Sequence, residues 1–139
     1  MHVLSCIFCD IITKKREGHF IYEDDDHVAV LDKYPIDKGH SLVLPKKHYE
    51  KITDMDPTSV GSLFSKIPAI TRAILSATNA DAFSLAQNNG RAAKQIIPHV
   101  HVHIIPRYSD VGAVWTKRTI PSSDELDSLA QKIRQHMKA

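Results

Sequence analysis

The stretch HVHVHII, residues 99–105, alternates three histidines with aliphatic residues. Successive residues of a β-strand point to opposite faces, so this pattern predicts a strand with His99, His101 and His103 on the same face. The aliphatic residues between them would then face a hydrophobic core. We therefore expect one face of this strand to pack and the other to carry out chemistry or bind a metal.

Three interpretations of the histidine face are open from the residues alone. An amphipathic strand accounts well for an isolated histidine, but less well for three at a period of two. Zinc ligation is a second interpretation, although the backbones of His99 and His103 would lie about 13 Å apart, too far for all three to share a tetrahedral ion. The third is a nucleophilic imidazole that attacks phosphorus, flanked by histidines that bind the phosphoryl oxygens.

Length and composition limit the kind of protein that carries this strand. The 139 residues, of which 42% are hydrophobic, predict a single domain over residues 1–139 with one core. A net charge of +2, spread along the chain, does not indicate a nucleic-acid or membrane surface. No apolar run reaches the roughly 20 residues of a membrane span, and the first residues lack the pattern of a signal peptide. We therefore expect a cytoplasmic location.

The two cysteines, Cys6 and Cys9, are three positions apart. In a reducing compartment this spacing favours a metal or redox role over a structural disulfide, with a pair of buried free thiols as the alternative.

Short strands are expected at residues 19–23, 28–31, 41–44, 82–86 and 100–105. Because short turns connect most of them, they predict an antiparallel sheet of about five strands with helices beside it, an α+β domain.

The helices are marked by caps and prolines. Residues 6–14 are typical of a short helix. Asp56 before Pro57 predicts the start of a long helix that ends near residue 79, with Pro68 bending or dividing it. Ser122 and Glu125 have the spacing of a capping box for a last helix that ends near residue 137.

Beyond HVHVHII, four further stretches are similar to landmarks of the histidine triad (HIT) family: CIFCDII at 6–12, LDKYPIDKGHSLVLPKKH at 31–48, QNNG at 87–90 and IIPRY at 104–108. The chain most resembles the Hint-like branch and its zinc-carrying microbial members, over most of positions 6–115. The resemblance implies the HIT-like fold, a nucleotide hydrolase or nucleotidyl transferase, a homodimer, and a C-terminal extension from about residue 107.

The resemblance also implies catalytic roles for particular residues. His101 corresponds to the nucleophile, which attacks the α-phosphorus to form a nucleotidyl-histidine that water then resolves. His103 and His40 correspond to phosphate ligands, and Asn88 to a polar contact near the scissile phosphate.

Substrate and metal contacts follow by the same correspondence. Asp32 matches a carboxylate that accepts hydrogen bonds from the ribose hydroxyls. The apolar pocket around the base corresponds to Ile7, Phe8, Ile11, Val30 and Leu31, each of which ordinary core packing would explain equally well. The ligands of a structural zinc ion correspond to Cys6, Cys9, His48 and His99. The triad would thus divide between metal and phosphate.

The chain departs from the family at Lys94, Gln95 and Ile96, where members often carry Gly-Gln-Ser or Gly-Gln-Thr. The hydroxyl near the leaving group is missing, while Gln95 keeps its place among the expected substrate-binding residues. We hypothesise that Lys94 attracts an anionic leaving group, and a solvated loop lysine is the alternative. Further on, Trp115, Lys117 and Arg118 would close over the leaving group, unless Trp115 packs on the sheet or on a partner subunit.

The expected function is hydrolysis of purine nucleoside phosphoramidates or related nucleotide conjugates, with AMP or GMP as product. A dinucleoside polyphosphate hydrolase or phosphorylase is the alternative within enzymes. A non-catalytic nucleotide-binding adaptor and a hydrolase whose zinc activates water are alternatives of other kinds.

Overall fold

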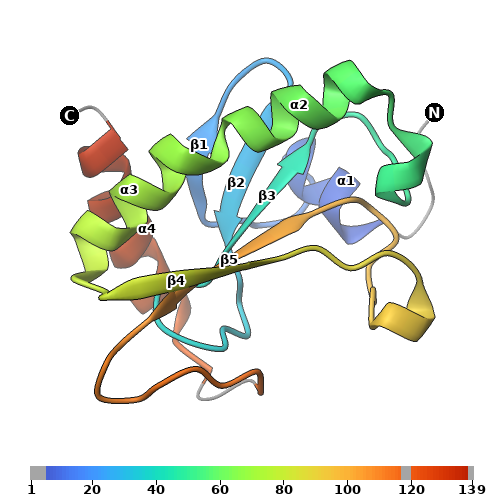
Figure 1. Ribbon diagram of the computed structural model, residues 1–139. Coiled ribbons are helices and arrows are strands. Elements are labelled where there is room, and N and C mark those ends of the chain that lie inside the picture. The colour runs from blue at the N-terminus through green and yellow to red at the C-terminus, as the bar shows by residue number, and fades with distance from the viewer. Residues whose placement is uncertain (1–5, 117–119, 138–139) are drawn as a thin grey trace.

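The computed structural model describes residues 6–116 and 120–137. Its centre is a five-stranded antiparallel sheet, as the sequence predicts, in the order β1-β2-β3-β5-β4 (Figure 1). The strands are β1 (Phe20–Glu23), β2 (His27–Leu31), β3 (Ser41–Pro45), β4 (Ala82–Ala86) and β5 (Val102–Arg107). The helices are α1 (Ile7–Ile12), α2 (Pro57–Ser65), α3 (Ile67–Thr78) and α4 (Ser123–Met137), with short 3-10 turns η1 (Ile52–Asp54) and η2 (Arg91–Ala93).

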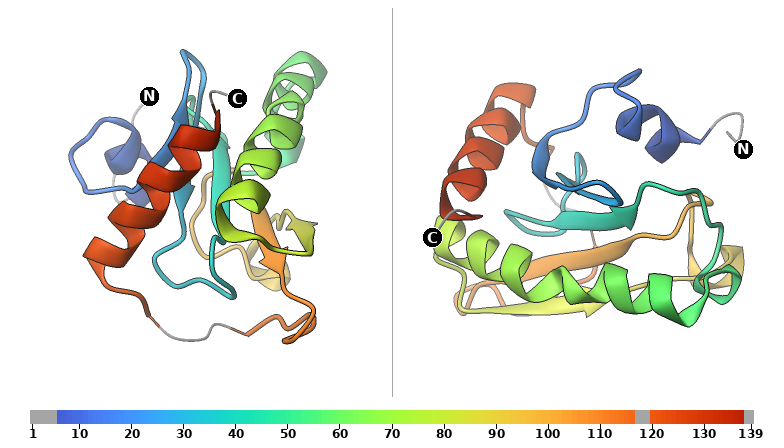
Figure 2. Two further views of the ribbon diagram at one scale, coloured as in Figure 1. Left: turned by 90° about the vertical axis from the view of Figure 1, so that its left-hand side faces the viewer. Right: turned by 90° about the horizontal axis from the view of Figure 1, so that it is seen from above.

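The sheet buries both of its faces. One face packs against α2, α3 and α4 in a core that includes Ala29, Val43 and Val102. The other face packs against α1, with Val28, Val30 and Leu42 in a second, smaller core. Figure 2 shows α1 and the α2–α3 pair on opposite sides of the sheet. Because neighbouring residues of a strand alternate between these cores, the register decides which side chains reach each face.

The predicted long helix is divided at the proline, as expected. Asp56 caps α2 by accepting a hydrogen bond from the Ser59 N–H at 3.1 Å. Helix α2 ends at Ser65, with Lys66 as its C-cap, and Pro68 lies in the first turn of α3, where a proline nitrogen needs no hydrogen-bond partner. Figure 1 shows the two helices as a bent rod across the sheet.

The last helix begins at the predicted capping box. The Glu125 N–H donates to Ser122 Oγ, and the Ser122 N–H donates to the Glu125 carboxylate, both at 3.1 Å. None of the helices in the described ranges is long and apolar enough to cross a membrane.

The strand that carries the histidines begins at Val102, two residues later than predicted. The backbone before Val102 does not form sheet hydrogen bonds with β3, because the Val100 N–H donates to the carbonyl of Tyr49. The alternation continues nevertheless, because Val100, Val102 and Ile104 all belong to the α2–α4 core. The predicted helix at 6–14 also ends early, at Ile12, since Lys14 takes a left-handed backbone conformation with φ of 65°.

Candidate functional site

The three histidines project from the face of the sheet that carries α1. His103 lies opposite Leu42 of β3, a residue of the smaller core. The Phe8 ring of α1 lies edge-on to His99 and His101, with ring centroids 5.9 and 4.9 Å apart. Helix α1 therefore helps to fix the orientation of both imidazoles.

A backbone carbonyl holds the ring of His101. Its Nδ1 lies 2.7 Å from the carbonyl oxygen of His99. A carbonyl only accepts hydrogen bonds, so the proton of the neutral ring is on Nδ1 and the lone pair is on Nε2. The side chain is 8% exposed, and this burial lowers the pKa of His101 below 6.5. The ring is therefore neutral at pH 7, with a nucleophilic Nε2.

A second chain of hydrogen bonds orients His40 and His103. The N–H of Ile36 donates to Nδ1 of His40 at 3.0 Å, which puts the proton of a neutral His40 ring on Nε2. That Nε2 lies 2.9 Å from Nδ1 of His103 and 3.6 Å from the carboxylate of Asp32. His103 then accepts at Nδ1 and carries its own proton on Nε2. The arrangement presents a hydrogen-bond donor beside His101, with ring centroids 4.9 Å apart.

Asn88 lies in the segment that follows β4. The last register pair of β4 and β5 is Ala86 with His103. Asn88 comes two residues after Ala86, and His101 comes two residues before His103.

The predicted base pocket is only partly assembled. Phe8, Ile11 and Val30 lie together in the smaller core, joined by Leu42, which the sequence analysis did not single out. Ile7 is 37% exposed on the outer side of α1. Leu31 belongs to the opposite core, because it neighbours Val30 in β2 and therefore points through the other face.

The four predicted zinc ligands converge. Nδ1 of His99 lies 3.5 Å from Cys6 Sγ, 3.7 Å from Cys9 Sγ and 3.2 Å from Nδ1 of His48. Cys9 Sγ and Nδ1 of His48 are 3.4 Å apart. Zinc bonds of about 2.3 Å to sulfur and 2.0–2.1 Å to nitrogen place neighbouring ligands of a tetrahedron about 3.3–3.8 Å apart. The donor set therefore fits a structural zinc ion.

A further contact prepares His99 for this role. Its Nε2 donates to the carbonyl of Pro45 at 2.8 Å, so the lone pair is on Nδ1, which faces the cysteines. Burial lowers the pKa of His99 to about 4. The ring is therefore a neutral donor at pH 7.

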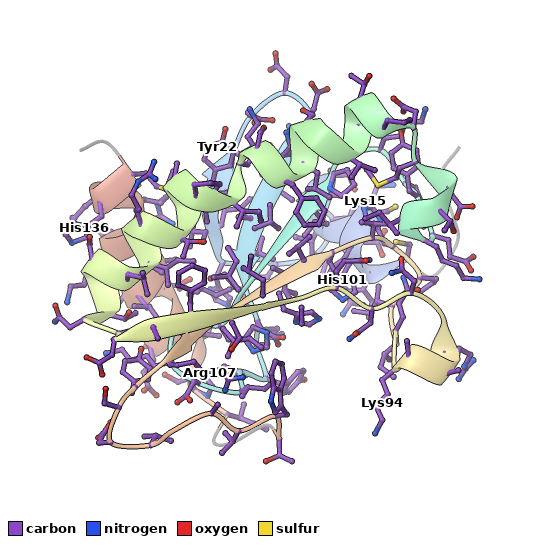
Figure 3. The ribbon with its side chains drawn as sticks, viewed as in Figure 1. Lys15, Tyr22, Lys94, His101, Arg107 and His136 are labelled. Atoms are coloured by element: carbon purple, nitrogen blue, oxygen red, sulfur yellow. The ribbon has the colours of Figure 1, made fainter. Side chains whose placement is uncertain are left out.

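Lys94, Gln95 and Ile96 differ in their surroundings: Gln95 is buried, and the other two are exposed. Gln95 is buried, and its amide accepts from the Gly90 N–H at 2.6 Å and donates to the carbonyl of Glu50 at 2.6 Å. It thus braces the backbone of the loop before the triad. Lys94 is exposed directly after η2, and Figure 3 shows its side chain extending away from His101. Ile96 is 86% exposed.

Trp115 contacts Arg107, the last residue of β5. Its ring stacks over the guanidinium of Arg107 with 4.6 Å between Cζ and the ring centroid, and the side chain stays 60% exposed. Lys117 and Arg118 lie outside the described residues.

A cavity of about 720 Å³ lies between the segment that follows β2 and helix α4. Asp32 and His40 form part of its wall, while His101 and His103 do not. Most of its lining comes from α4 and from Leu31 to Gly39, so the cavity adjoins the candidate site at Asp32 and His40.

Sequence reasoning missed the groups that fix the imidazoles. The carbonyls of Pro45 and His99 and the N–H of Ile36 decide which ring nitrogen carries the proton. Backbone groups have no signature in a sequence, so only the fold could reveal these contacts.

Comparison with known proteins identifies similar sequences. The family model described as HIT domain matches residues 13–110. The chain is 38% identical over 138 residues to adenylylsulfatase HINT3 of Arabidopsis thaliana, covering 96% of this chain and 70% of that protein. It is 33% identical over 138 residues to adenosine 5'-monophosphoramidase hnt1 of Schizosaccharomyces pombe, covering 97% and 100%.

Solved structures show the same fold. A histidine triad nucleotide-binding protein from Sulfolobus tokodaii superposes with a TM-score of 0.88 at 37% identity, covering 96% of this chain and 92% of that one. A Zn-bound histidine triad family protein from Mycobacterium smegmatis superposes with a TM-score of 0.86 at 31% identity, covering 97% and 94%.

Proposed function

The chain belongs to the HIT domain family, and on this premise we propose that it is a nucleotide hydrolase that attacks the α-phosphorus of purine nucleoside phosphoramidates or related conjugates. One observation carries the proposal: the His99 carbonyl holds Nδ1 of His101, which leaves the lone pair of a neutral, largely buried ring on Nε2. Similarity to proteins named as a monophosphoramidase and an adenylylsulfatase supports the substrate class.

The reaction proceeds in two displacements. Nε2 of His101 forms a bond to the α-phosphorus while the bond from phosphorus to the leaving group breaks, and the leaving group takes the electron pair. Water then attacks the same phosphorus, breaks the bond to His101 and gives the nucleoside monophosphate, AMP or GMP. The ring returns to its starting state because the proton stays on Nδ1 throughout, donated in a hydrogen bond to the His99 carbonyl.

The neighbouring polar groups bind the rest of the nucleotide. The Nε2–H of His103, oriented by His40, donates to a phosphoryl oxygen as negative charge develops there. Asn88 contacts the phosphate from the segment after β4. The Asp32 carboxylate accepts hydrogen bonds from the two ribose hydroxyls, and its side chain is 11% exposed. Phe8, Ile11 and Val30 contact the base.

The lack of a hydroxyl at Ile96 that could protonate the leaving group favours a second class of substrate, in which the leaving group departs as an anion. A departing amine needs a proton, and Ile96 offers no hydroxyl where related proteins often carry one. A leaving group that departs as an anion, such as sulfate or a phosphate ester, needs no proton. We therefore propose nucleoside phosphosulfates and dinucleoside polyphosphates as alternative substrates. Lys94 is exposed and its side chain extends away from His101, which favours the alternative of a solvated loop lysine.

The zinc ligands support the site without joining the reaction. Cys6, Cys9, His48 and His99 would hold a structural zinc ion, which links α1 to the residues that precede β5. When bound, zinc supplies only this cross-link, because its four ligands come from the protein and complete a closed tetrahedron.

The edge of the sheet supports the predicted homodimer. Among the described residues, β4 pairs with β5 on one side and with no strand on the other. Phe83 and Leu85 of this strand are 45% and 46% exposed. Open edges with apolar side chains are usually covered, so we propose that β4 of a second copy covers this one.

Cytoplasmic location stays a prediction.

The covalent intermediate provides the direct test. Protein mixed with excess adenosine 5'-phosphoramidate, quenched within one turnover and digested, should carry an adenylyl group on His101, located by mass spectrometry. A parallel reaction with adenosine 5'-phosphosulfate compares how fast His101 is adenylylated when the leaving group is sulfate and when it is an amine. Turnover without any adenylylated histidine would refute this mechanism, and absence of turnover with tight nucleotide binding would favour the adaptor.

A further inference from the structure

A second group of reactive side chains lies on the opposite face of the sheet. Val28 and Val30 of β2 point toward α1, so His27, at the start of the same strand, points toward α2. There it meets Asp24 of the β1–β2 turn and Ser62 of α2. Figure 3 shows the neighbouring Tyr22 close to the α2–α3 helices.

The carboxylate of this group is firmly anchored. Asp24 Oδ1 accepts the backbone N–H groups of Asp26 at 2.8 Å and His27 at 2.7 Å, and Oδ2 accepts the Tyr22 hydroxyl at 2.7 Å. Burial acts to raise the pKa of Asp24, but these hydrogen bonds outweigh it and lower the pKa below its usual range. Asp24 is therefore an anion in a fixed orientation.

The histidine is oriented by that anion. Nδ1 of His27 lies 3.0 Å from Asp24 Oδ1 and 3.2 Å from Oδ2. An ionised carboxylate only accepts, so a neutral His27 ring carries its proton on Nδ1 and its lone pair on Nε2. Nε2 lies 3.3 Å from Ser62 Oγ, and the His27 side chain is 5% exposed. In this form of the ring, the Ser62 hydroxyl donates to a buried, preoriented base.

We propose that Ser62 is an activated nucleophile, with His27 as its base and Asp24 as the residue that orients the base, and that it accepts the acyl group of an activated carboxylic ester. The order of contacts, carboxylate to Nδ1 and Nε2 to hydroxyl, is the order found in serine hydrolases. Lys66 lies one helical turn beyond Ser62, with its Nζ 3.7 Å from Asp24 Oδ2. This ion pair helps to hold the Asp24 carboxylate in place.

The step balances without any further reactant. Ser62 Oγ bonds to the acyl carbon while its proton passes to His27 Nε2. The ester C–O bond then breaks, and His27 gives that proton to the departing oxygen, so that the alcohol leaves neutral. Water attacks the acyl-serine as His27 takes one of its protons, the bond to Ser62 Oγ breaks, and His27 returns the proton to Oγ, which gives the carboxylic acid and free serine.

Two other serines of α2 are built-in controls. Ser59 Oγ donates to the Asp56 carboxylate at 2.6 Å, and Ser65 Oγ donates to the Ser62 carbonyl at 2.6 Å. Both hydroxyls thus donate to oxygen atoms and not to a histidine. Trypsin releases all three serines on one peptide, residues 52–66. Their reactivities can therefore be compared within a single digest.

An alkyl fluorophosphonate is the probe for the test. The serine oxygen displaces fluoride from phosphorus, and fragment ions of the 52–66 peptide show which serine carries the phosphonyl group. We expect Ser62 to react roughly 100-fold faster than Ser59 or Ser65, the typical contribution of a general base. The variant His27→Gln should reduce labelling of Ser62 to the level of the other two, and Ser62→Ala should remove it.

A merely structural hydrogen bond between α2 and the hairpin gives a different result. In that case the three serines of the natural sequence would be labelled equally slowly, and this outcome overturns the proposal. Circular dichroism and zinc content establish that His27→Gln is folded. If it is not folded, the comparison of Ser62 with Ser59 and Ser65 in the unchanged protein still decides the question. The test involves no nucleotide, so it is independent of the proposed function.

Discussion

The carbonyl oxygen of His99 lies 2.7 Å from Nδ1 of His101, while the ring of the same His99 faces Cys6 and Cys9. One residue thus connects the candidate zinc cluster with the candidate nucleophile. The ring of His99 is anchored in turn by the carbonyl of Pro45. Because the orientation of His101 depends on where the His99 backbone lies, the metal cluster and the reactive imidazole form one structural unit.

Replacing the nucleophile should separate binding from chemistry. We expect His101→Ala to lower kcat at least about 1,000-fold, since the covalent route is lost, while the Kd for AMP changes by less than about tenfold. Single-turnover kinetics and calorimetry measure the two quantities. His136→Ala, which removes an exposed histidine of α4, serves as the matched control. Comparable losses in both variants would contradict the assignment.

The carboxylate of Asp32 should be needed only when the ribose has its hydroxyls. We expect Asp32→Asn to lower kcat/KM for the ribonucleotide by roughly tenfold or more, because hydrogen bonds to a charged acceptor contribute about 1.5–3 kcal/mol. The 2',3'-dideoxy substrate should be hydrolysed equally well by both proteins. A loss of the same size on both substrates would instead mean that Asp32 acts mainly by holding His40.

Removing the metal should loosen the protein before it stops the reaction. We expect about one zinc ion per chain by atomic spectroscopy, and a Tm at least about 10 °C lower in Cys9→Ser or after chelation. Activity should fall in step with the loss of structure followed by circular dichroism. Immediate loss of turnover on chelation, with the fold intact, would favour a zinc ion that activates water.

The pH profile should reflect the buried ring of His101. Burial lowers its pKa from 6.5, so the neutral, nucleophilic form persists below that pH. We expect kcat/KM to stay level from pH 7.5 to below 6.5 and to fall only in more acid solution. Because the unfolded ring has the higher pKa and binds the proton more readily, the same residue destabilises the fold as pH falls below 6.5. An acid limb centred above 6.5 would contradict this account.

A charged residue on the open edge strand should abolish association. We expect Phe83→Asp to convert a dimer to a monomer in light scattering, since it places a carboxylate on the apolar edge of β4. Ile96→Asp, at an even more exposed apolar residue outside the sheet, is the control and should leave the dimer intact. A natural protein that is monomeric at all concentrations would refute the proposed interface.

Much of this arrangement could be predicted from the sequence because it depends on side chains with strict local rules. The proline that divides α2 from α3 and the capping box at Ser122 each impose one local geometry, and both predictions are confirmed. The convergence of Cys6, Cys9, His48 and His99 was expected from family resemblance and not from spacing. The face of Leu31 was wrongly assigned, since a shift of one residue along a strand reverses the direction of its side chain. The start of β5 could not be predicted, because it depends on the bond from the Val100 N–H to the Tyr49 carbonyl.

Helix α4 has a consequence for the synthesis of the protein. Leu126, Ala130 and Ile133 fill the main core beside residues of β1 and β2, although about a hundred residues separate them in the chain. Arg134 also donates to the backbone carbonyl of Phe20 at 2.6 Å. A nascent chain therefore keeps an open apolar surface until residue 137 has left the ribosome, and products of premature termination would expose that surface to chaperones and proteases.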